Sequence, residues 1–361
     1  MTMNDLTITV SPPNLISQAE GPHWFPTMLF RLSDGGLLLG FSVCADELPG
    51  NIAGGMPHAL LKSLDNGHNW ACQTIVTGRL YGEAFPYGML ADGRMLGILG
   101  GASGILLDEN GTPYSLEYVS TDGARTWEGP HKTPIVFPQE QELGKAVVAP
   151  GRTLVPFAFE GNLIERRNGT LLRVVDGKLA GDSHTRIGIM QSTDGARSWS
   201  YLSTVTDQST APLDFNESAL LEVSDGELIC VMRSDGDSRG NVMFQARSLD
   251  GGRTWSRPAS LGHNGVRPQM VRLRNGTIAC SYGRLSGWPS AGVQVMFSRD
   301  GGASWVQHTT IHEKASTGYT ALLEVRPNEL MLVYDQLGYG WSRVNSINSV
   351  RISVNTGDST E

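Results

Sequence analysis

The chain has 361 residues, more than the ~250–300 over which one hydrophobic core usually grows, so two domains or a repeat architecture is expected. Its 44 glycines and 18 prolines favour tight turns between short strands and argue against a helical protein. The net charge of −8, with the basic residues scattered along the chain, argues against a nucleic-acid partner.

The start of the sequence, MTMNDLTITVSPP, lacks the basic segment and apolar run of a signal peptide. No apolar stretch approaches the ~20 residues of a membrane helix. We therefore expect a cytoplasmic protein without a membrane partner, or a secreted one if the natural chain begins earlier. Cys44, Cys230 and Cys280 lie in apolar runs without metal-site spacing, so we expect buried free thiols, no metal and no cofactor.

Six segments in chain order have two apolar runs around a turn, which is typical of β-hairpins. Four of the turns contain Asp-Gly or Asn-Gly, strong hairpin signals. The segments span residues 25–43, 85–101, 145–160, 217–233, 267–284 and 319–336.

After each of the first five hairpins comes a short apolar segment and then an eight-residue motif of Ser-x-Asp ending in Trp. The Asp side chain is suited to bond backbone N–H groups in a turn, and Gly accepts positive φ there. The copies are SLDNGHNW (63–70), STDGARTW (120–127), STDGARSW (192–199), SLDGGRTW (248–255) and SRDGGASW (298–305).

Each repeat therefore supplies a hairpin, a third strand, the Asp turn and a fourth strand. Such units arranged around an axis make an all-β fold, here a six-bladed β-propeller of four-stranded antiparallel blades in a single domain, 1–361. Residues 349–355 or 5–10 are alternatives for completing the last blade. Blade three is predicted to carry an insert at about 160–185, read as an extra hairpin with its own Asn-Gly and Asp-Gly turns.

In a propeller, the residues that begin and end each first hairpin share one rim, because an antiparallel hairpin brings its two ends together. Residues expected at the starts are Trp24, Glu83, Lys145, Glu217, Arg267 and Tyr319. Those expected at the ends are Asp46 or Glu47, Gly101, Glu160, Arg233, Arg284 and Asp335. This gathering of carboxylates, arginines and a tyrosine predicts a functional site, with structural ion pairs as the alternative.

The five Asp motifs resemble the Asp-box, or BNR repeat, of the sialidase superfamily, over residues ~20 to ~345. Two copies have Ala124 and Ala196 where the family usually has glycine. The Asp-box itself indicates fold rather than chemistry, since proteins without enzymatic activity carry it too.

The resemblance also implies roles for site residues. NESALLEVSDGELICVMR resembles the sialidase segment with a glutamate paired to the catalytic tyrosine, here Glu217, and a carboxylate-binding arginine, here Arg233. GYTALLEVRPNELMLVYDQ resembles the segment with the nucleophile, which maps to Tyr319. A neutral phenol suits a sugar whose anomeric carbon bears a carboxylate, because an anionic nucleophile is repelled there. The acidic residue in the loop after the first hairpin, the general acid by resemblance, is Asp46.

The sequence also departs from the sialidase pattern. Trp24 replaces the first of the three family arginines, and no arginine occupies the third position, for which Arg267 and Arg284 are the nearest substitutes. Glu83, Glu160 and Trp24 complete the predicted substrate-binding set. His184 is either a proton shuttle or an exposed loop residue.

The predicted function is an exo-acting retaining glycoside hydrolase that releases a terminal acidic sugar from a glycan. Two alternatives stay open. A uronate-specific polysaccharide lyase also needs a cation, to neutralise the sugar carboxylate, and a Tyr or His, to move the proton. Its unsaturated product absorbs ultraviolet light. A non-catalytic carbohydrate-binding propeller binds sugar without turnover. In every case the expected partner is a carbohydrate.

Overall fold

The computed structural model describes residues 6–20, 24–43, 57–76, 84–98, 104–138, 146–149, 152–235, 242–283, 292–338 and 344–357. All regular structure in these ranges is β-strand, which confirms the all-β class. None of the described residues forms a helix long and apolar enough to cross a membrane. The chain divides into two compact units, the first comprising Met1–Ala45, Ala59–Gln73 and Asn264–Glu361, and the second Asp46–His58 and Thr74–His263.

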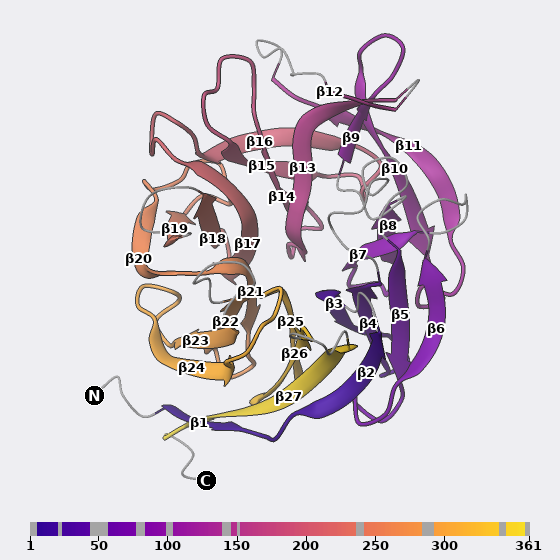
Figure 1. Ribbon diagram of the computed structural model, residues 1–361. Coiled ribbons are helices and arrows are strands. Elements are labelled where there is room, and N and C mark those ends of the chain that lie inside the picture. Colours follow the sequence, from indigo (N-terminus) through magenta and orange to yellow (C-terminus); the bar gives the residue numbers. More distant parts are fainter. Residues whose placement is uncertain are drawn as a thin grey trace. The chain divides into compact units, whose positions relative to one another are not determined.

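The first unit holds three sheets (Figure 1). One orders β3 (Trp24–Arg31), β4 (Leu37–Ser42), β5 (His58–Ser63) and β6 (Ala71–Val76), with the unit division falling inside β5 and β6. Another orders β21 (Val266–Arg272), β22 (Ile278–Gly283), β23 (Val293–Ser298) and β24 (Val306–His312). The last contains β1 (Leu6–Val10), β2 (Asn14–Glu20), β25 (Thr320–Arg326), β26 (Glu329–Gln336) and β27 (Val344–Thr356).

Strands from both ends of the chain complete this last sheet, whose order is β1-β27-β26-β25. Leu6 pairs with Thr356 and Val10 with Ile352. The two segments that the sequence offered as alternatives therefore both take part, as the third and fourth strands. β2 also pairs with β27, and β1, β2 and β27 lie side by side in Figure 1.

The second unit contains a four-stranded sheet and a ten-stranded sheet. The smaller sheet orders β17 (Asp214–Ser224), β18 (Glu227–Asp235), β19 (Val242–Ser248) and β20 (Ala259–Asn264). The larger contains β7 (Phe85–Met89), β8 (Met95–Ile98), β9 (Gly104–Leu107), β10 (Pro113–Ser120), β11 (Glu128–Val136), β12 (Ala146–Ala149), β13 (Arg152–Glu165), β14 (Leu171–Gly177), β15 (Arg186–Ser192) and β16 (Trp199–Thr206). It joins the second and third predicted blades, because β9 pairs with both β10 and β13. The number of blades therefore stays a prediction.

The predicted insert at about 160–185 is wrong as a description of these residues. β13 and β14 form a hairpin around Asn168–Gly169, and β14 pairs in continuous register with β15 from Leu171–Ser192 to Gly177–Arg186. Residues 160–177 are thus integral strands of the sheet. The segment that the sequence assigned as the first hairpin, 145–160, instead supplies the short β12 and the beginning of β13. The error arose because β13 is 14 residues long and its first part was read as a complete strand.

The five Asp motifs fold in the same way, as predicted. In each, the Ser hydroxyl donates to the Asp carboxylate over 2.7–2.8 Å and accepts the N–H of the residue four positions along. That residue has positive φ in Gly67 and Gly252, and in Ala124 and Ala196 as well, which departs from the usual glycine without losing the turn. Hydrogen bonds, led by that of the Thr254 hydroxyl, lower the pKa of Asp250 from 3.8 to about 2.

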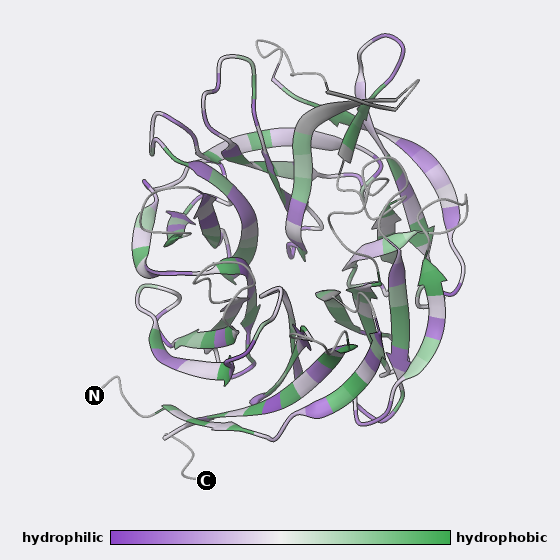
Figure 2. Ribbon diagram, in the orientation of Figure 1, coloured by the Kyte–Doolittle hydropathy of each residue, from purple (hydrophilic) through white to green (hydrophobic). Residues whose placement is uncertain are grey.

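The cores consist of strand residues whose side chains alternate or are buried on both faces. β4 is buried throughout, whereas β27 alternates, and Figure 2 shows the corresponding green and purple bands along β27. In the first unit, Leu37, Leu39 and Phe41 pack with Met331 and Val333. Cys230 and Cys280 are fully buried free thiols, as predicted, while Cys44 lies outside the described residues.

The second unit also buries a charged cluster in its core. Glu117 is 4 % exposed and accepts hydrogen bonds from Tyr87 Oη, Ser115 Oγ (2.9 Å) and Trp199 Nε1 (3.2 Å). The guanidinium of Arg173 lies 3.7 Å from the ring centre of Tyr87. Its Nε and Nη1 have no hydrogen-bond partner among the described residues. Burial raises the pKa values of Glu117 and Tyr87 and lowers that of Arg173, while the opposite charges of Glu117 and Arg173 favour each other.

Candidate functional site

The ends of β17 and β18 carry the arginine and glutamate that the sequence singled out. Arg233 Nη1 donates to Glu217 Oε2 over 2.7 Å, and Arg233 Nη2 lies 2.9 Å from Asp235 Oδ1. Asn216 Nδ2 donates to the other oxygen of Asp235. The antiparallel register explains the grouping, since Asn216 pairs with Arg233 and Asp214 with Asp235. The prediction that one hairpin brings Glu217 and Arg233 to the same end of a sheet is confirmed.

A β-bulge places Glu217 on the same side of the hairpin as its neighbour. Consecutive strand residues normally point to opposite faces. The register shifts between Asn216 and Ser218, and Glu217 is held at φ 38°. The extra residue lets Asn216 reach Asp235 while Glu217 reaches Arg233. Because non-glycine residues rarely adopt positive φ, this backbone is strained.

The same strained bulge recurs in two sheets of the first unit. In β3 the register shifts around Phe25, which has φ 47°, and in β21 it shifts between Val266 and Gln269, where Arg267 has φ 45°. In each case the residue lies at the start of the first strand of its sheet, as Glu217 does in β17. Strained conformations persist only where surrounding structure holds them, and they cluster at functional sites.

Tyr319, the predicted nucleophile, is packed against the two first-unit bulge residues. Its ring centre lies 4.7 Å from that of Phe25, with the planes inclined by 59°. The guanidinium carbon of Arg267 lies 5.3 Å from the ring centre of Tyr319, within the range of a cation–π contact. Tyr319 and Arg267 are both partly exposed, and Phe25 is buried. An arginine and a tyrosine, 52 positions apart, are thus brought together.

Glu160 lies in the second unit beside the Glu217 segment. β13 packs against β17, and a Cβ on Gly161 would lie 2.3 Å from the backbone oxygen of Ser218. Gly161 has φ 65°, and only glycine fits this approach. Glu160 and Glu217 are therefore each followed by a residue, Gly161 or Ser218, whose backbone contacts that of the other on the neighbouring strand.

Asp335 ends the hairpin that Tyr319 begins, as predicted, because Thr320 pairs with Tyr334, but its side chain is buried. It is 0 % exposed at the end of β26, where it accepts hydrogen bonds from Ser316 and Thr317. Its carboxylate faces the turn that precedes Tyr319 rather than solvent. Burial raises the pKa of Asp335 from 3.8 to about 6.

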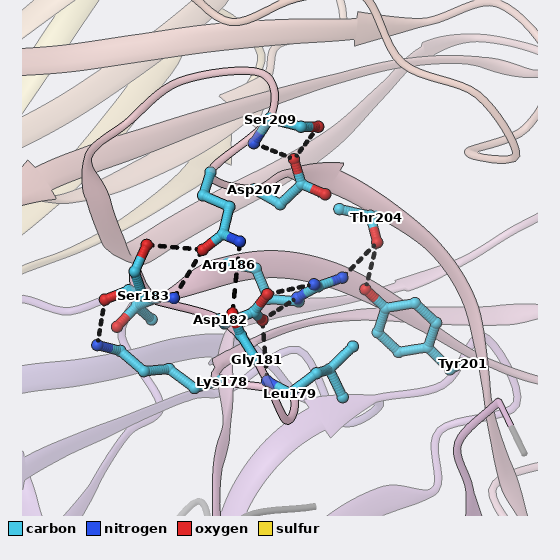
Figure 3. Close-up of polar contacts among 12 residues, drawn as sticks. Lys178, Leu179, Gly181, Asp182, Ser183, Arg186, Tyr201, Thr204, Asp207 and Ser209 are labelled. Atoms are coloured by element: carbon cyan, nitrogen blue, oxygen red, sulfur yellow. Dashed lines mark hydrogen bonds and ion pairs between the residues drawn. The ribbon is translucent and has the colours of Figure 1, made fainter. Parts of the chain in front are cut away.

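The imidazole of His184 is hydrogen-bonded to the carboxylate of Asp214. Its Nδ1 lies 3.2 Å from Asp214 Oδ2, and the N–H of Thr185 donates to Asp214 Oδ1 over 2.7 Å. The loop before it is fixed by Asp182, which binds Arg186 through both oxygens over 2.6 and 2.7 Å and accepts the N–H of Leu179 (Figure 3).

Several predicted site residues lie outside the described structure. They are Asp46, Glu47, Glu83, Gly101, Lys145 and Arg284, and for Trp24 only the backbone in β3 is described. Of the predicted residues that are described, Tyr319 and Arg267 belong to the first unit and Glu160, Glu217 and Arg233 to the second. Across the described ranges, no group of three His, Cys, Asp or Glu side chains has the arrangement of a metal site.

The sequence interpretation missed Asn216, Asp235 and Phe25. Asp235 follows Arg233 by two positions, so the period of a strand already places both on one face. Phe25 was overlooked in favour of Trp24 because a bulge moves the equivalent position by one residue.

Comparison with known proteins bears on this arrangement of hairpins and Asp motifs. A sequence profile of the BNR repeat-like domain matches residues 108–332, more than half of the chain. The chain belongs to the BNR repeat-like family. A curated sialidase of Bacteroides fragilis is 26% identical over 216 residues, which cover 47% of this chain and 38% of the relative. The match thus spans well under half of that protein, and together these findings place the BNR chain in the sialidase superfamily.

Solved structures share the fold of this BNR chain at low sequence identity. A protein of unknown function from Dyadobacter fermentans is 21% identical, with a TM-score of 0.74, covering 96% of this chain and 99% of that one. A Hadza microbial sialidase is 17% identical, with a TM-score of 0.64 and coverage of 95% and 67%. An α-L-arabinofuranosidase of Fusarium graminearum is 16% identical, with a TM-score of 0.64 and coverage of 95% and 97%.

Proposed function

We propose that this BNR-family chain is an exo-acting retaining glycoside hydrolase that releases a terminal acidic sugar, sialic acid or a related compound, from a glycan. The observation that carries the proposal is the strained backbone at Glu217 and Arg267. The sequence predicts both residues for the site from their chemistry, and each occupies the bulged position near the start of the first strand of its sheet. Such strain is a recurrent feature of functional sites. The proposed overall fold is a six-bladed propeller, supported by the shared fold with a sialidase.

In the proposed reaction, the Tyr319 oxygen attacks the anomeric carbon while Glu217 takes the phenolic proton. The glycosidic C–O bond breaks as Asp46 protonates the leaving oxygen. Water then attacks the anomeric carbon of the glycosyl-tyrosine, gives its proton to the Asp46 carboxylate, and the phenoxide recovers its proton from Glu217. The phenol is suited to this step because the substrate carboxylate repels an anionic nucleophile.

The arginines are proposed to hold the substrate carboxylate. Arg267 supports this role because its guanidinium lies over the ring of Tyr319, the proposed nucleophile. Arg233 and Arg284 are the other proposed donors. Arg233 already binds Glu217 and Asp235, so it has fewer donors left for a substrate than a free guanidinium.

Because the guanidinium of Arg233 already binds two carboxylates, a second candidate function is a hydrolase of a neutral sugar. Around Arg233, the carboxylates of Glu217 and Asp235 outnumber the single positive charge, which disfavours an acidic ligand at this point. Glu160 and Glu217 on neighbouring strands would then act as the acid and nucleophile of the usual two-carboxylate mechanism. The shared fold with an α-L-arabinofuranosidase is consistent with this alternative.

A panel of 4-methylumbelliferyl glycosides separates the candidates. It contains N-acetylneuraminic acid, a uronic acid, L-arabinofuranose and common neutral hexoses, and turnover is followed by fluorescence. Hydrolysis of the neuraminic acid glycoside with retained anomeric configuration supports the proposal, whereas preference for the arabinofuranoside selects the neutral-sugar candidate. An ultraviolet-absorbing product from a uronate glycan selects a lyase, and sugar binding without turnover selects a binding protein.

Replacement of Tyr319 tests the nucleophile directly. Tyr319→Phe keeps the ring against Phe25 and Arg267 and removes only the attacking oxygen. Under the proposal it abolishes hydrolysis, while Glu160→Gln, at a predicted substrate-binding residue, raises KM without abolishing turnover. The neutral-sugar candidate requires the reverse order of effects.

A further inference from the structure

The turn that carries Tyr319 is organised by one buried carboxylate. Asp335 Oδ1 accepts the hydroxyls of Ser316 (3.1 Å) and Thr317 (2.7 Å), and Oδ2 accepts the N–H of Thr317 (3.0 Å). Asp335, Ser316 and Thr317 are 0 %, 0 % and 3 % exposed. Three donors from two consecutive residues before β25 thus converge on a single side chain of β26.

The same two hydroxyls transmit this anchoring to Tyr319. Ser316 Oγ accepts the N–H of Gly318 over 2.9 Å, and Thr317 Oγ1 accepts the N–H of Tyr319 over 3.3 Å. Each hydroxyl therefore donates to Asp335 and accepts from the backbone that leads to the phenol. A carboxylate is an acceptor only, so it fixes the direction of both hydroxyl protons.

The surrounding backbone closes the other sides of the turn. A Cβ on Gly283 would lie 2.4 Å from the Cα of Gly318, so β22 and the turn are in direct backbone contact. Leu337, just after Asp335, donates its N–H to the carbonyl of Ala315 over 2.9 Å. On the far side of Tyr319, the hydroxyl of Thr320 is hydrogen-bonded to Ser281 over 2.7 Å.

We propose that Asp335 is a positioning residue that sets the place of the Tyr319 oxygen by holding the Ser316–Thr317 turn. This inference rests on the proposed function, in which Tyr319 is the nucleophile. The residue does not touch the reacting atoms, and it acts through two hydroxyls and two backbone N–H groups. Misplacement of a catalytic group by about 1 Å can lower a rate by about 10²-fold, so an anchor of this kind affects kcat more than KM.

The test compares variants on 4-methylumbelliferyl N-acetylneuraminate at a temperature where all are folded. Asp335→Asn is expected to lower kcat ~10–100-fold with KM changed less than ~2-fold. Thr317→Val, which removes the linking hydroxyl at constant shape, should lower kcat similarly, and Thr317→Ser should restore it. Asp182→Asn is the matched control, because it removes a partly buried, hydrogen-bonded carboxylate in the other unit and should leave kcat unchanged.

Hydrogen exchange supplies a readout that needs no substrate. The amides of the segment 316–320 should exchange faster in Asp335→Asn and Thr317→Val, and at the wild-type rate in Asp182→Asn. Unchanged exchange, or wild-type kcat in both turn variants while Tyr319→Phe is inactive, overturns the positioning role and leaves the proposed function standing. An active Tyr319→Phe instead overturns the proposed function, and the inference with it.

Discussion

Replacing Glu117 with glutamine removes a buried charge while keeping the size of the side chain. Glu117 accepts three hydrogen bonds and is paired electrostatically with Arg173, which is 2 % exposed. In the variant, the amide nitrogen is a donor that must face one of the three donors. Arg173 keeps its charge and loses the neighbouring carboxylate, while its Nε and Nη1 already have no acceptor in the described structure.

The magnitude follows from these two losses. Removing one partner of a buried ion pair costs about 3–5 kcal/mol, because the other charge stays buried without compensation. A donor facing a donor adds to the cost, since hydrogen bonds to charged groups contribute about 1.5–3 kcal/mol each. We therefore expect Glu117→Gln to lose at least about 3 kcal/mol, a large part of the 5–15 kcal/mol typical of folded proteins.

The assay is urea unfolding followed by tryptophan fluorescence, because Trp199 donates directly to Glu117. The matched set contains Arg173→Met and the double variant Glu117→Gln/Arg173→Met. If the two charges stabilise each other, the double variant is less destabilised than the sum of the single variants, by about 1–3 kcal/mol. A loss below about 1 kcal/mol in Glu117→Gln, or strictly additive losses, would refute the reasoning.

Three further predictions concern the candidate site. Arg233→Lys should lower kcat/KM at least ~10-fold, because an ammonium lacks the planar fork that bonds two partners at once, and wild-type rates in a folded variant would contradict this. Tyr319→Phe and Glu217→Gln should each abolish most turnover, with the double variant little worse than either, since the effects of residues that act together in one chemical step are not additive. Multiplicative losses in the double variant would show that the two residues act independently. Asp335 has its pKa raised to about 6, so its protonated form stabilises the fold. That contribution is complete below about pH 3 and is lost as the pH rises through 6, so the wild type should lose about 3 kcal/mol relative to Asp335→Asn between pH 3 and 7. Parallel stability–pH curves would count against this assignment.

Much of the local structure follows from the sequence, because the contacts that fix it lie within a few residues. The Ser and Asp of each Asp motif bond to groups no more than four positions along, so all five copies in this chain close the same turn. The hairpin 217–233 is likewise fixed by Asp225-Gly226 and by two apolar runs of matched length. This locality explains why Glu217 and Arg233 were correctly paired from the sequence.

Only the tertiary structure shows the side-chain contacts between residues that are far apart in the sequence. Trp199 bonds to Glu117 across 82 positions, and Tyr319 packs on Phe25, from the opposite end of the chain. Nothing in the local pattern VYDQ shows that Asp335 is buried under the Tyr319 turn, because its partners Ser316 and Thr317 lie 19 and 18 positions away, in the segment before β25. A bulge moves side chains by one position and costs only a local strain, so hydrophobic periodicity does not reveal it. For the same reason, the long strand 152–165 was divided incorrectly: the sequence sets which residues favour strands, and only pairing with β9 and β14 sets where this one ends.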